Sequence, residues 1–335
     1  MNLIGEHTDY NGGLVLPMTL PQRTEVELEP RNDLRVTVWS EGFGAGEFHV
    51  GGERRGCGWL DRVQGCTAAA SAAGHAIGGF DARIRSTVPV GAGVASSAAL
   101  GVSLLRALRS AYALTLDDLA LALLAQQAER EFTGVRVGIM DQLAASLGAE
   151  GIALLIDTSS FAVERVSIPP RAEVVVIDSA VSHDHAHGEY NRRRAECEAA
   201  AQELGVRSLR EVPNAQTRLG GTLGARVRHV VSENARVLAT VEALRAGDLE
   251  LAGVMLRDSH RSLRDDYEVS SPELDALVAL AEAHPDTYGA RMTGGGFGGS
   301  IVALAARGAG EDVAKEVVRG YRELTGLVGR KLLPV

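Results

Sequence analysis

Lysine is nearly absent from this chain of 335 residues. Only Lys315 and Lys331 occur, so arginine carries almost all of the positive charge. The net charge of −9 at pH 7 has the wrong sign for a surface that binds nucleic acid or an anionic membrane. We therefore expect neither partner, and any phosphate group that binds has to be neutralised locally.

Cysteine and long apolar runs are scarce as well. The chain has three cysteines, Cys57, Cys66 and Cys197, and no C-x-x-C pair. An odd number without such a pair disfavours a disulfide framework and predicts that the protein is located in a reducing cytoplasm. The densest apolar stretch, residues 119–125, is too short to cross a bilayer. No basic region precedes the first apolar residues, so we do not expect a secretory signal.

The length and the segment pattern predict two domains of mixed helices and strands. A chain of this length exceeds the usual size of one core. Residues 23–30 and 34–41 alternate apolar and polar side chains, which predicts two strands of an antiparallel sheet with one solvated face. Residues 80–90 predict a third strand. Pro169 and Pro170 interrupt the pattern and predict a boundary, with domains at 1–170 and 171–335.

Further segments are predicted by periodicity and capping. One apolar helix face is predicted within residues 116–132, made of Leu116, Leu119, Ala120, Leu123 and Leu124. Ser271 is a suitable N-cap for a helix whose first turn holds Pro272. Other predicted helices are 96–114, 191–204 and 225–246, and other predicted strands are 152–160, 172–180 and 331–335. The late glycine-rich stretch is predicted to lead into a strand, which a helix separates from the last strand.

The stretch "PVGAGVASSAALGVS" (Pro89–Ser103) lies between a predicted strand and a predicted helix. Free backbone N–H groups and the helix dipole make such a junction suitable for an anion. Gly91 and Gly93 permit close backbone approach, and Ser96 and Ser97 offer hydroxyls to phosphate or Mg²⁺. A Walker loop is excluded because no Gly-Lys-Ser/Thr follows. A capped helix after a flexible turn explains this stretch equally well when it is considered alone.

Two other stretches contain residues that could bind a ligand or a cation. Glu129 ends one predicted helix, and Asp141 is placed in the first turn of the next, where the helix N-terminus stabilises a carboxylate. Asp141 could accept a proton from a hydroxyl and Glu129 could hold a cation, although a helix-start residue and a solvated one are the simpler interpretation. The late stretch "TGGGFGG" (293–299) indicates close backbone approach to a ligand or to a neighbouring loop.

The motifs taken together indicate a protein family more specifically than any one of them does alone. GEHTDYNGG at the start, P-x-G-x-G-x-x-S-S-A in the middle, GIMDQ and then TGGGFGG occur in this order. The set resembles the galactokinases, within the superfamily of galactokinase, homoserine kinase, mevalonate kinase and phosphomevalonate kinase (GHMP kinases). The resemblance covers nearly the whole chain and includes "GEYNRRRAECE" (188–198) and "SHRSLRDDYEVSSPELD" (259–275).

The resemblance implies a two-domain α+β fold. Its N-terminal α/β domain has a left-handed βαβ crossover, and its C-terminal domain is ferredoxin-like. It implies an ATP-dependent enzyme, with Mg²⁺, that phosphorylates the C1 hydroxyl of galactose in the cytoplasm, and we expect a monomer. Two alternatives stay open: a catalytically weak regulator that binds galactose and ATP, and a kinase of a related sugar such as N-acetylgalactosamine.

The resemblance also assigns residues. Asp141 is the implied catalytic base, and Ser97 and Glu129 are the implied Mg²⁺ ligands. The implied sugar contacts are Glu6, His7, Thr8, Asp9 and Tyr190. The implied ATP phosphate loop consists of Gly91, Ala92, Gly93, Val94, Ala95, Ser96 and Ser97.

The chain departs from the family pattern at three places. Ala95 stands where the usual phosphate loop has its first serine, but Ser96 and Ser97 remain. His183, His185 and His187 alternate and could bind metal, although a polar loop is the simpler interpretation and we assign no metal to them. The family carries an Arg that would lie before Met1. We therefore expect a form shortened at its N-terminus, less stable and slower than a longer one.

Overall fold

The computed structural model describes residues 1–182, 186–214 and 218–334. By their internal contacts these residues form two compact units. The first consists of Met1–Leu20, Gly91–Val94 and Ala149–Val335, and the second of Pro21–Val90 and Ala95–Gly148. The division is thus discontinuous, whereas the linear division into 1–170 and 171–335 stays a prediction for the two family domains.

The second unit is built on a mixed four-stranded sheet. Its strands are β2 (Thr24–Pro30), β3 (Arg35–Ser40), β4 (Gly44–His49) and β5 (Phe80–Ser86), in the order β2-β5-β3-β4. The strands predicted at 23–30 and 34–41 exist, but the predicted antiparallel sheet is wrong, because the sheet is mixed: β5 lies between β2 and β3, antiparallel to β2 and parallel to β3. The short connection between β2 and β3 resembles a hairpin locally, whereas strand order is decided by long-range packing.

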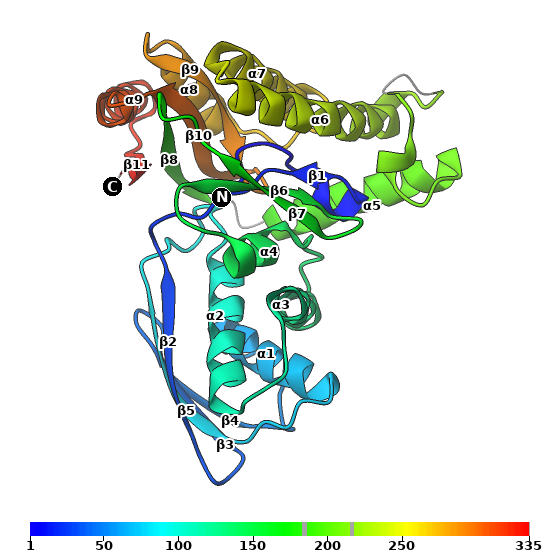
Figure 1. The fold of residues 1–335 in the computed structure, drawn as a ribbon, viewed down its shortest axis with the longest axis vertical. Coiled ribbons are helices and arrows are strands. Elements are labelled where there is room, and N and C mark those ends of the chain that lie inside the picture. The colour runs from blue at the N-terminus through cyan, green and yellow to red at the C-terminus, as the bar shows by residue number, and fades with distance from the viewer. Residues whose placement is uncertain (183–185, 215–217, 335) are drawn as a thin grey trace. The chain divides into compact units, whose positions relative to one another are not determined.

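Helices cover one face of this sheet and complete the core of the second unit (Figure 1). They are α1 (Asp61–Ala72), α2 (Ser96–Ala111) and α3 (Asp118–Thr133), and α4 (Met140–Leu147) packs against α2 and α3. The predicted apolar face of α3 is displaced: Leu121, Leu124, Ala125 and Ala128 are buried, whereas Leu123 is 37% exposed. The displacement arises because α3 packs against α1, α2 and α4 together rather than against a single surface.

The C-terminal part of the first unit has the predicted ferredoxin-like order. Its strands are β8 (Ala172–Ser182), β9 (Thr287–Thr293), β10 (Gly298–Ala306) and β11 (Arg330–Leu333), paired antiparallel as β11-β8-β10-β9. With the helices between β8 and β9 and the helix between β10 and β11, this is the β-α-β-β-α-β arrangement. Its helices are α5 (Ala186–Leu204), α6 (Gly221–Ala246), α7 (Leu249–Asp265), α8 (Pro272–Glu282) and α9 (Gly310–Thr325).

A small antiparallel sheet in the same unit holds the opening segment. It consists of β1 (Leu14–Val15), β6 (Ile152–Asp157) and β7 (Ala162–Ser167), in the order β1-β6-β7. Bridges from Asn2 to Pro17 and from Met18 to Ala153 extend the pairing on either side of β1. The polar cluster at the start of the chain is therefore supported by strands that follow it by about 140 residues in sequence.

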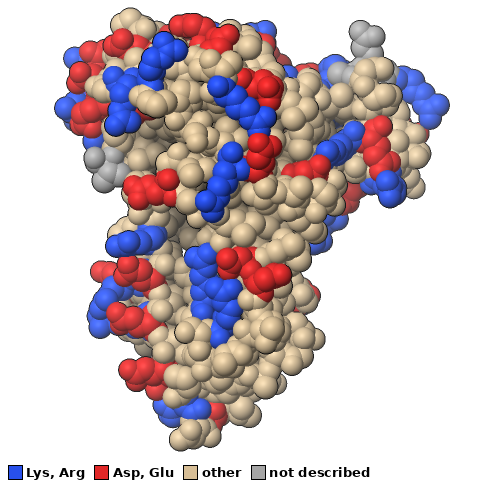
Figure 2. Space-filling view, in the orientation of Figure 1, with Lys and Arg blue, Asp and Glu red and all other residues tan. Residues whose placement is uncertain are grey.

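On the face that Figure 2 shows, acidic and basic side chains of the described residues are interspersed rather than gathered into one extended basic area. Within the described ranges, no helix combines the length and the apolar character that crossing a membrane requires. Short 3₁₀ helices occupy Asp9–Asn11, Gly58–Leu60 and Leu209–Glu211.

Candidate active site

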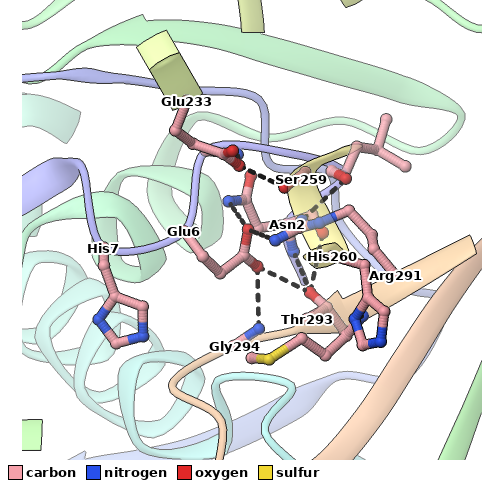
Figure 3. A network of polar contacts seen from close by, with 12 residues as sticks. Asn2, Glu6, His7, Glu233, Ser259, His260, Arg291, Thr293 and Gly294 are labelled. Carbon is pink, nitrogen blue, oxygen red and sulfur yellow. Dashed lines mark hydrogen bonds and ion pairs between the residues drawn. The ribbon is translucent and has the colours of Figure 1, made fainter. Parts of the chain in front are cut away.

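Glu6 is buried at the centre of a polar network that joins the two ends of the sequence (Figure 3). Its carboxylate accepts hydrogen bonds from Asn2 Nδ2 at 2.8 Å and from the Gly294 N–H at 2.9 Å. The hydroxyl of Thr293 lies 3.1 Å from Oε1, and the Arg291 guanidinium lies 2.5 Å from Oε2. Burial raises the pKa of Glu6 and Arg291 opposes this rise. Both carboxylate oxygens already have protein partners.

The backbone of the opening segment is held from α6 and α7. Glu233 accepts a hydrogen bond from the Gly5 N–H at 3.0 Å, and Ser259 donates to the same oxygen at 2.6 Å. Arg236 donates to the other carboxylate oxygen at 2.8 Å. Burial raises the pKa of Glu233 but is outweighed by Arg236 and the other charges around it, so that the pKa falls to about 2. An ionised carboxylate therefore fixes the loop immediately before Glu6.

The Thr8 side chain stabilises the loop through contacts with its backbone. Its hydroxyl lies 2.8 Å from the Gly5 carbonyl oxygen and 2.7 Å from that of Leu14, and the side chain is fully buried. Gly5 has φ +106°, and a Cβ there would lie 2.6 Å from the Leu14 carbonyl oxygen. The turn thus requires glycine and a buried hydroxyl. The geometry makes Thr8 part of the support of the loop.

His7 is locked as a single neutral tautomer by a chain of four hydrogen-bonding groups. Its Nε2 lies 3.2 Å from the carbonyl oxygen of Gly295, which can only accept, so Nε2 carries the proton. Nδ1 then accepts from the Tyr10 hydroxyl at 2.8 Å, and Tyr10 accepts from the Tyr267 hydroxyl at 2.8 Å. Tyr267 in turn lies 3.0 Å from the thiol of Cys197. Burial lowers the pKa of His7 to about 3, which agrees with a neutral ring.

Tyr190 lies beside the His7 imidazole, and Asp9 follows His7 in the chain. The Tyr190 ring, in α5, is 5.4 Å from the His7 ring and 5.5 Å from the Tyr10 ring, measured between centroids. Asp9 begins the 3₁₀ helix that follows His7, is half-buried, and accepts a hydrogen bond from the Tyr10 N–H. The structure therefore brings four of the predicted sugar residues and Tyr190 together within one unit.

The first part of the phosphate loop packs against the late glycine-rich turn. Ser300 donates to the carbonyl oxygen of Ala92 at 2.7 Å. Gly294 has φ +86°, and a Cβ there would lie 2.7 Å from the Gly93 carbonyl oxygen. A Cβ at Gly296 would lie 2.2 Å from a backbone oxygen of Val269. Close backbone packing between loops explains these glycines, one of the two interpretations that the sequence left open.

Ser97 and Glu129, the predicted Mg²⁺ ligands, lie together within the second unit. Ser97, in the first turn of α2, forms a hydrogen bond with Glu129, and Gln142 Nε2 donates to Glu129 Oε2 at 2.9 Å. Arg62 Nε donates to the Ser97 hydroxyl at 3.0 Å. The Gln142 Oε1 atom is buried and has no hydrogen-bond partner among the described residues. Hard oxygen donors with one orphaned acceptor suit Mg²⁺.

Asp141 lies where the sequence predicts it, in the first turn of α4. Burial raises the pKa of Asp141, and its charge contributes to the raised pKa of Glu129, for which burial is the main cause. The two carboxyl groups are therefore within electrostatic reach of each other. Ala95 precedes α2 with φ +67° and makes no side-chain cap, so the departure from the family serine removes a possible cap.

The comparisons with known proteins agree with this geometry. Family models match residues 62–149 (GHMP kinases N terminal domain), 240–323 (GHMP kinases C terminal) and 1–30 (galactokinase galactose-binding signature). A galactokinase of Chloroflexus aurantiacus is 46% identical over all of this chain and 88% of its own length. The chain belongs to the galactokinase family. A Roseiflexus galactokinase is 42% identical over 97% of this chain and 86% of its own length.

Solved structures show the same family relationship. The structure of the Lactococcus lactis galactokinase complexed with galactose superposes with a TM-score of 0.94 and 34% identity, over 98% of this chain and 89% of the other. An L. major mevalonate kinase in complex with R-mevalonate gives a TM-score of 0.66 at 21% identity, over 97% and 89% of the two chains, which shows the shared fold. The two-domain GHMP kinase fold expected for a galactokinase is thereby confirmed.

Sequence reasoning missed several supporting residues of this galactokinase-family site. Cys197 and Tyr267 lie inside stretches that carry the resemblance, and Arg291 lies two residues before the late glycine-rich stretch, yet no role was assigned to them. Arg62 lies outside every quoted motif. His183 and His185 lie outside the described residues, as does the side chain of His187. Within the described ranges, no group of three or more His, Cys, Asp or Glu side chains is placed to hold a metal ion.

Proposed function

We propose that this chain is a galactokinase. It transfers the terminal phosphoryl group of ATP to the C1 hydroxyl of α-D-galactose, giving galactose 1-phosphate and ADP. The observation that carries the proposal is the match of residues 1–30 to the galactose-binding signature, because residues 1–18 of that match are mostly buried and are held by the contacts described above. The likeness to a galactokinase complexed with galactose supports the same substrate.

The predicted sugar residues fall into two groups, those that contact the sugar and those that support the loop around it. Asp9 and Tyr190 are half-buried, and the Tyr190 ring adjoins the His7 ring, so we assign the hydroxyl contacts of the sugar first to Asp9 and Tyr190. Carboxylate and imidazole groups pair well with the vicinal hydroxyls of a hexose. Glu6 and Thr8 are saturated by protein partners, and their part is to hold the loop. His7 has protein partners at both ring nitrogens, so the contact that we assign between its Nε2–H and a sugar hydroxyl replaces the hydrogen bond to the Gly295 carbonyl oxygen.

The phosphates of ATP are assigned to the segment Gly91–Ser97. Its last residues begin α2, so their backbone N–H groups and the helix dipole favour an anion. Ser97 and Glu129 would hold Mg²⁺, with Gln142 beside them. When bound, this ion neutralises charge on the phosphoryl group being transferred.

Asp141 is assigned as the base that accepts the proton of the C1 hydroxyl. General bases work best when their pKa lies near the operating pH, and burial moves the pKa of Asp141 in that direction. Asp141, Ser97 and Glu129 are all present, which favours an enzyme over a regulator that only binds its ligands. Free cysteines favour the cytoplasm as its location, and a monomer stays a prediction.

A sugar panel tests the proposal. Release of ADP is measured with galactose, N-acetylgalactosamine and glucose as acceptors, each with ATP and Mg²⁺. We expect turnover with galactose and much less with glucose. Turnover only with N-acetylgalactosamine would identify a kinase of that sugar. Binding of galactose without ADP release would identify a regulator.

A further inference from the structure

Arg62 directs its guanidinium group at the predicted cation site of the second unit. It lies in the first turn of α1, is half-buried, and donates from Nε to the Ser97 hydroxyl at 3.0 Å. Its charge also lowers the pKa of Glu129, against the larger effect of burial. Within the described residues, neither Nη1 nor Nη2 of Arg62 has a hydrogen-bond or ion-pair partner, so four of its five N–H groups are available.

The predicted phosphate loop has no cationic side chain of its own. The segment Gly91–Ser97 contains no basic residue, and both lysines of the chain pair with Glu311 in the first unit. An arginine presents a planar fork of donors that matches two phosphate oxygens at once. A guanidinium that only capped the Ser97 hydroxyl would use one donor and would not need the other four.

We propose that Arg62 binds the nucleotide phosphates directly and supplies the positive side chain that the phosphate loop lacks. The inference rests on the proposed function, because it takes Ser97 as part of the phosphate and Mg²⁺ site. Arg62 and Mg²⁺ then neutralise the same phosphates from neighbouring positions. The contribution of Arg62 is accordingly largest when the metal is absent.

The affinity of the protein for ADP, which binds without reacting, tests the proposal. The dissociation constant of ADP is measured by titration calorimetry for the full-length wild type, Arg62→Gln and Arg62→Lys, in EDTA and in Mg²⁺. We expect Arg62→Gln to weaken ADP binding in EDTA by ~10-fold or more, since it removes charge-assisted hydrogen bonds. Arg62→Lys keeps a positive charge but loses the planar pair of donors. We therefore expect its affinity for ADP to lie between those of the wild type and Arg62→Gln. The affinity for galactose stays unchanged.

An exposed arginine serves as the control. Arg23 has 77% of its side chain exposed and pairs with Glu25, so Arg23→Gln changes the total charge equally without touching the site. The ADP affinity of Arg62→Gln also depends less steeply on salt concentration than that of Arg23→Gln. Arg62→Lys keeps the test informative if Arg62→Gln does not fold.

Two results would overturn the inference. Equal ADP affinity of wild type, Arg62→Gln and Arg62→Lys in EDTA would show that Arg62 does not touch the phosphates, while galactose phosphorylation by the wild type would leave the proposed function standing. A wild type that binds no ADP and phosphorylates no sugar would overturn both.

Discussion

Arg291 and Glu6 form an ion pair that solvent does not reach. The Arg291 guanidinium nitrogen lies 2.5 Å from the Glu6 carboxylate, and their side chains are 0% and 1% exposed. Arg291 also donates to the Leu3 carbonyl oxygen at 2.9 Å. One residue of β9 therefore fixes both the backbone and the carboxylate of the galactose-binding signature.

Removing one partner of this pair should destabilise the protein strongly. Glu6→Gln leaves the buried charge of Arg291 uncompensated, which costs about 3–5 kcal/mol. The free energy of unfolding in urea measures this loss. The double variant Glu6→Gln/Arg291→Met should recover part of it, because no buried charge remains. A Glu6→Gln protein as stable as wild type would show that the pair does not support the loop.

Acid should unfold the protein in part through His229. This residue is buried against Ser262 and the Glu6 carbonyl, and burial lowers its pKa to about 4 from the ordinary 6.5. Between those two values the unfolded chain binds a proton that the folded one does not, so the free energy of unfolding falls as the pH falls. The group contributes up to about 1.4 kcal/mol per pH unit.

The variant His229→Gln tests this assignment. Urea unfolding at several values between pH 7 and pH 4.5 should give a shallower pH dependence than wild type. His49 is exposed, so His49→Gln serves as the matched control for the exchange itself. Identical slopes for wild type and His229→Gln would refute the assignment to His229.

Asp141→Asn should nearly abolish phosphorylation while galactose binding remains measurable. Loss of a general base lowers the rate by ~10²–10⁴-fold. Since burial raises the pKa of Asp141, the activity of wild type should also fall on acidification at a pH above the ordinary range of an aspartate. Steady-state turnover across pH measures both effects. Near-normal turnover of Asp141→Asn would remove Asp141 from the mechanism.

Glu129→Gln and Ser97→Ala should each raise the Mg²⁺ concentration needed for half-maximal activity. The two groups are assigned to the cation, so the galactose requirement should not change. Titrations of Mg²⁺ and galactose at saturating ATP separate the two requirements. If neither variant alters the Mg²⁺ titration, the ion is held by other residues.

Ala113→Gly should stabilise the protein. Ala113 is exposed, follows α2 and has φ +51°, and the Leu114 N–H donates to the Arg109 carbonyl oxygen as in a Schellman cap. Glycine adopts this conformation without strain, so we expect a gain of roughly 0.5–1 kcal/mol in the free energy of unfolding. Ala107→Gly, the same exchange inside α2, should lose about 1 kcal/mol. Equal effects of the two exchanges would contradict the cap.

The sequence by itself determined the features that depend on neighbours along the chain. The Ser271 hydroxyl accepts from the Leu274 N–H at the start of α8, with Pro272 in the first turn, as predicted. Asp141 lies in the first turn of α4, and the phosphate loop lies between β5 and α2. Capping and turn preferences act over a few residues, which is why local sequence suffices for them. The order of the motifs was sufficient to indicate the family.

Only the tertiary structure decided which distant residues meet. The sequence did not show that β5 separates β2 from β3, or that Leu123 faces solvent. Neither did it show that Arg62 reaches Ser97. Strand partners, helix orientation and buried ion pairs depend on packing between segments far apart in the chain, and one sequence carries no local trace of that packing. The supports of the site, from Cys197 to Arg291, became visible for this reason only once the chain was folded.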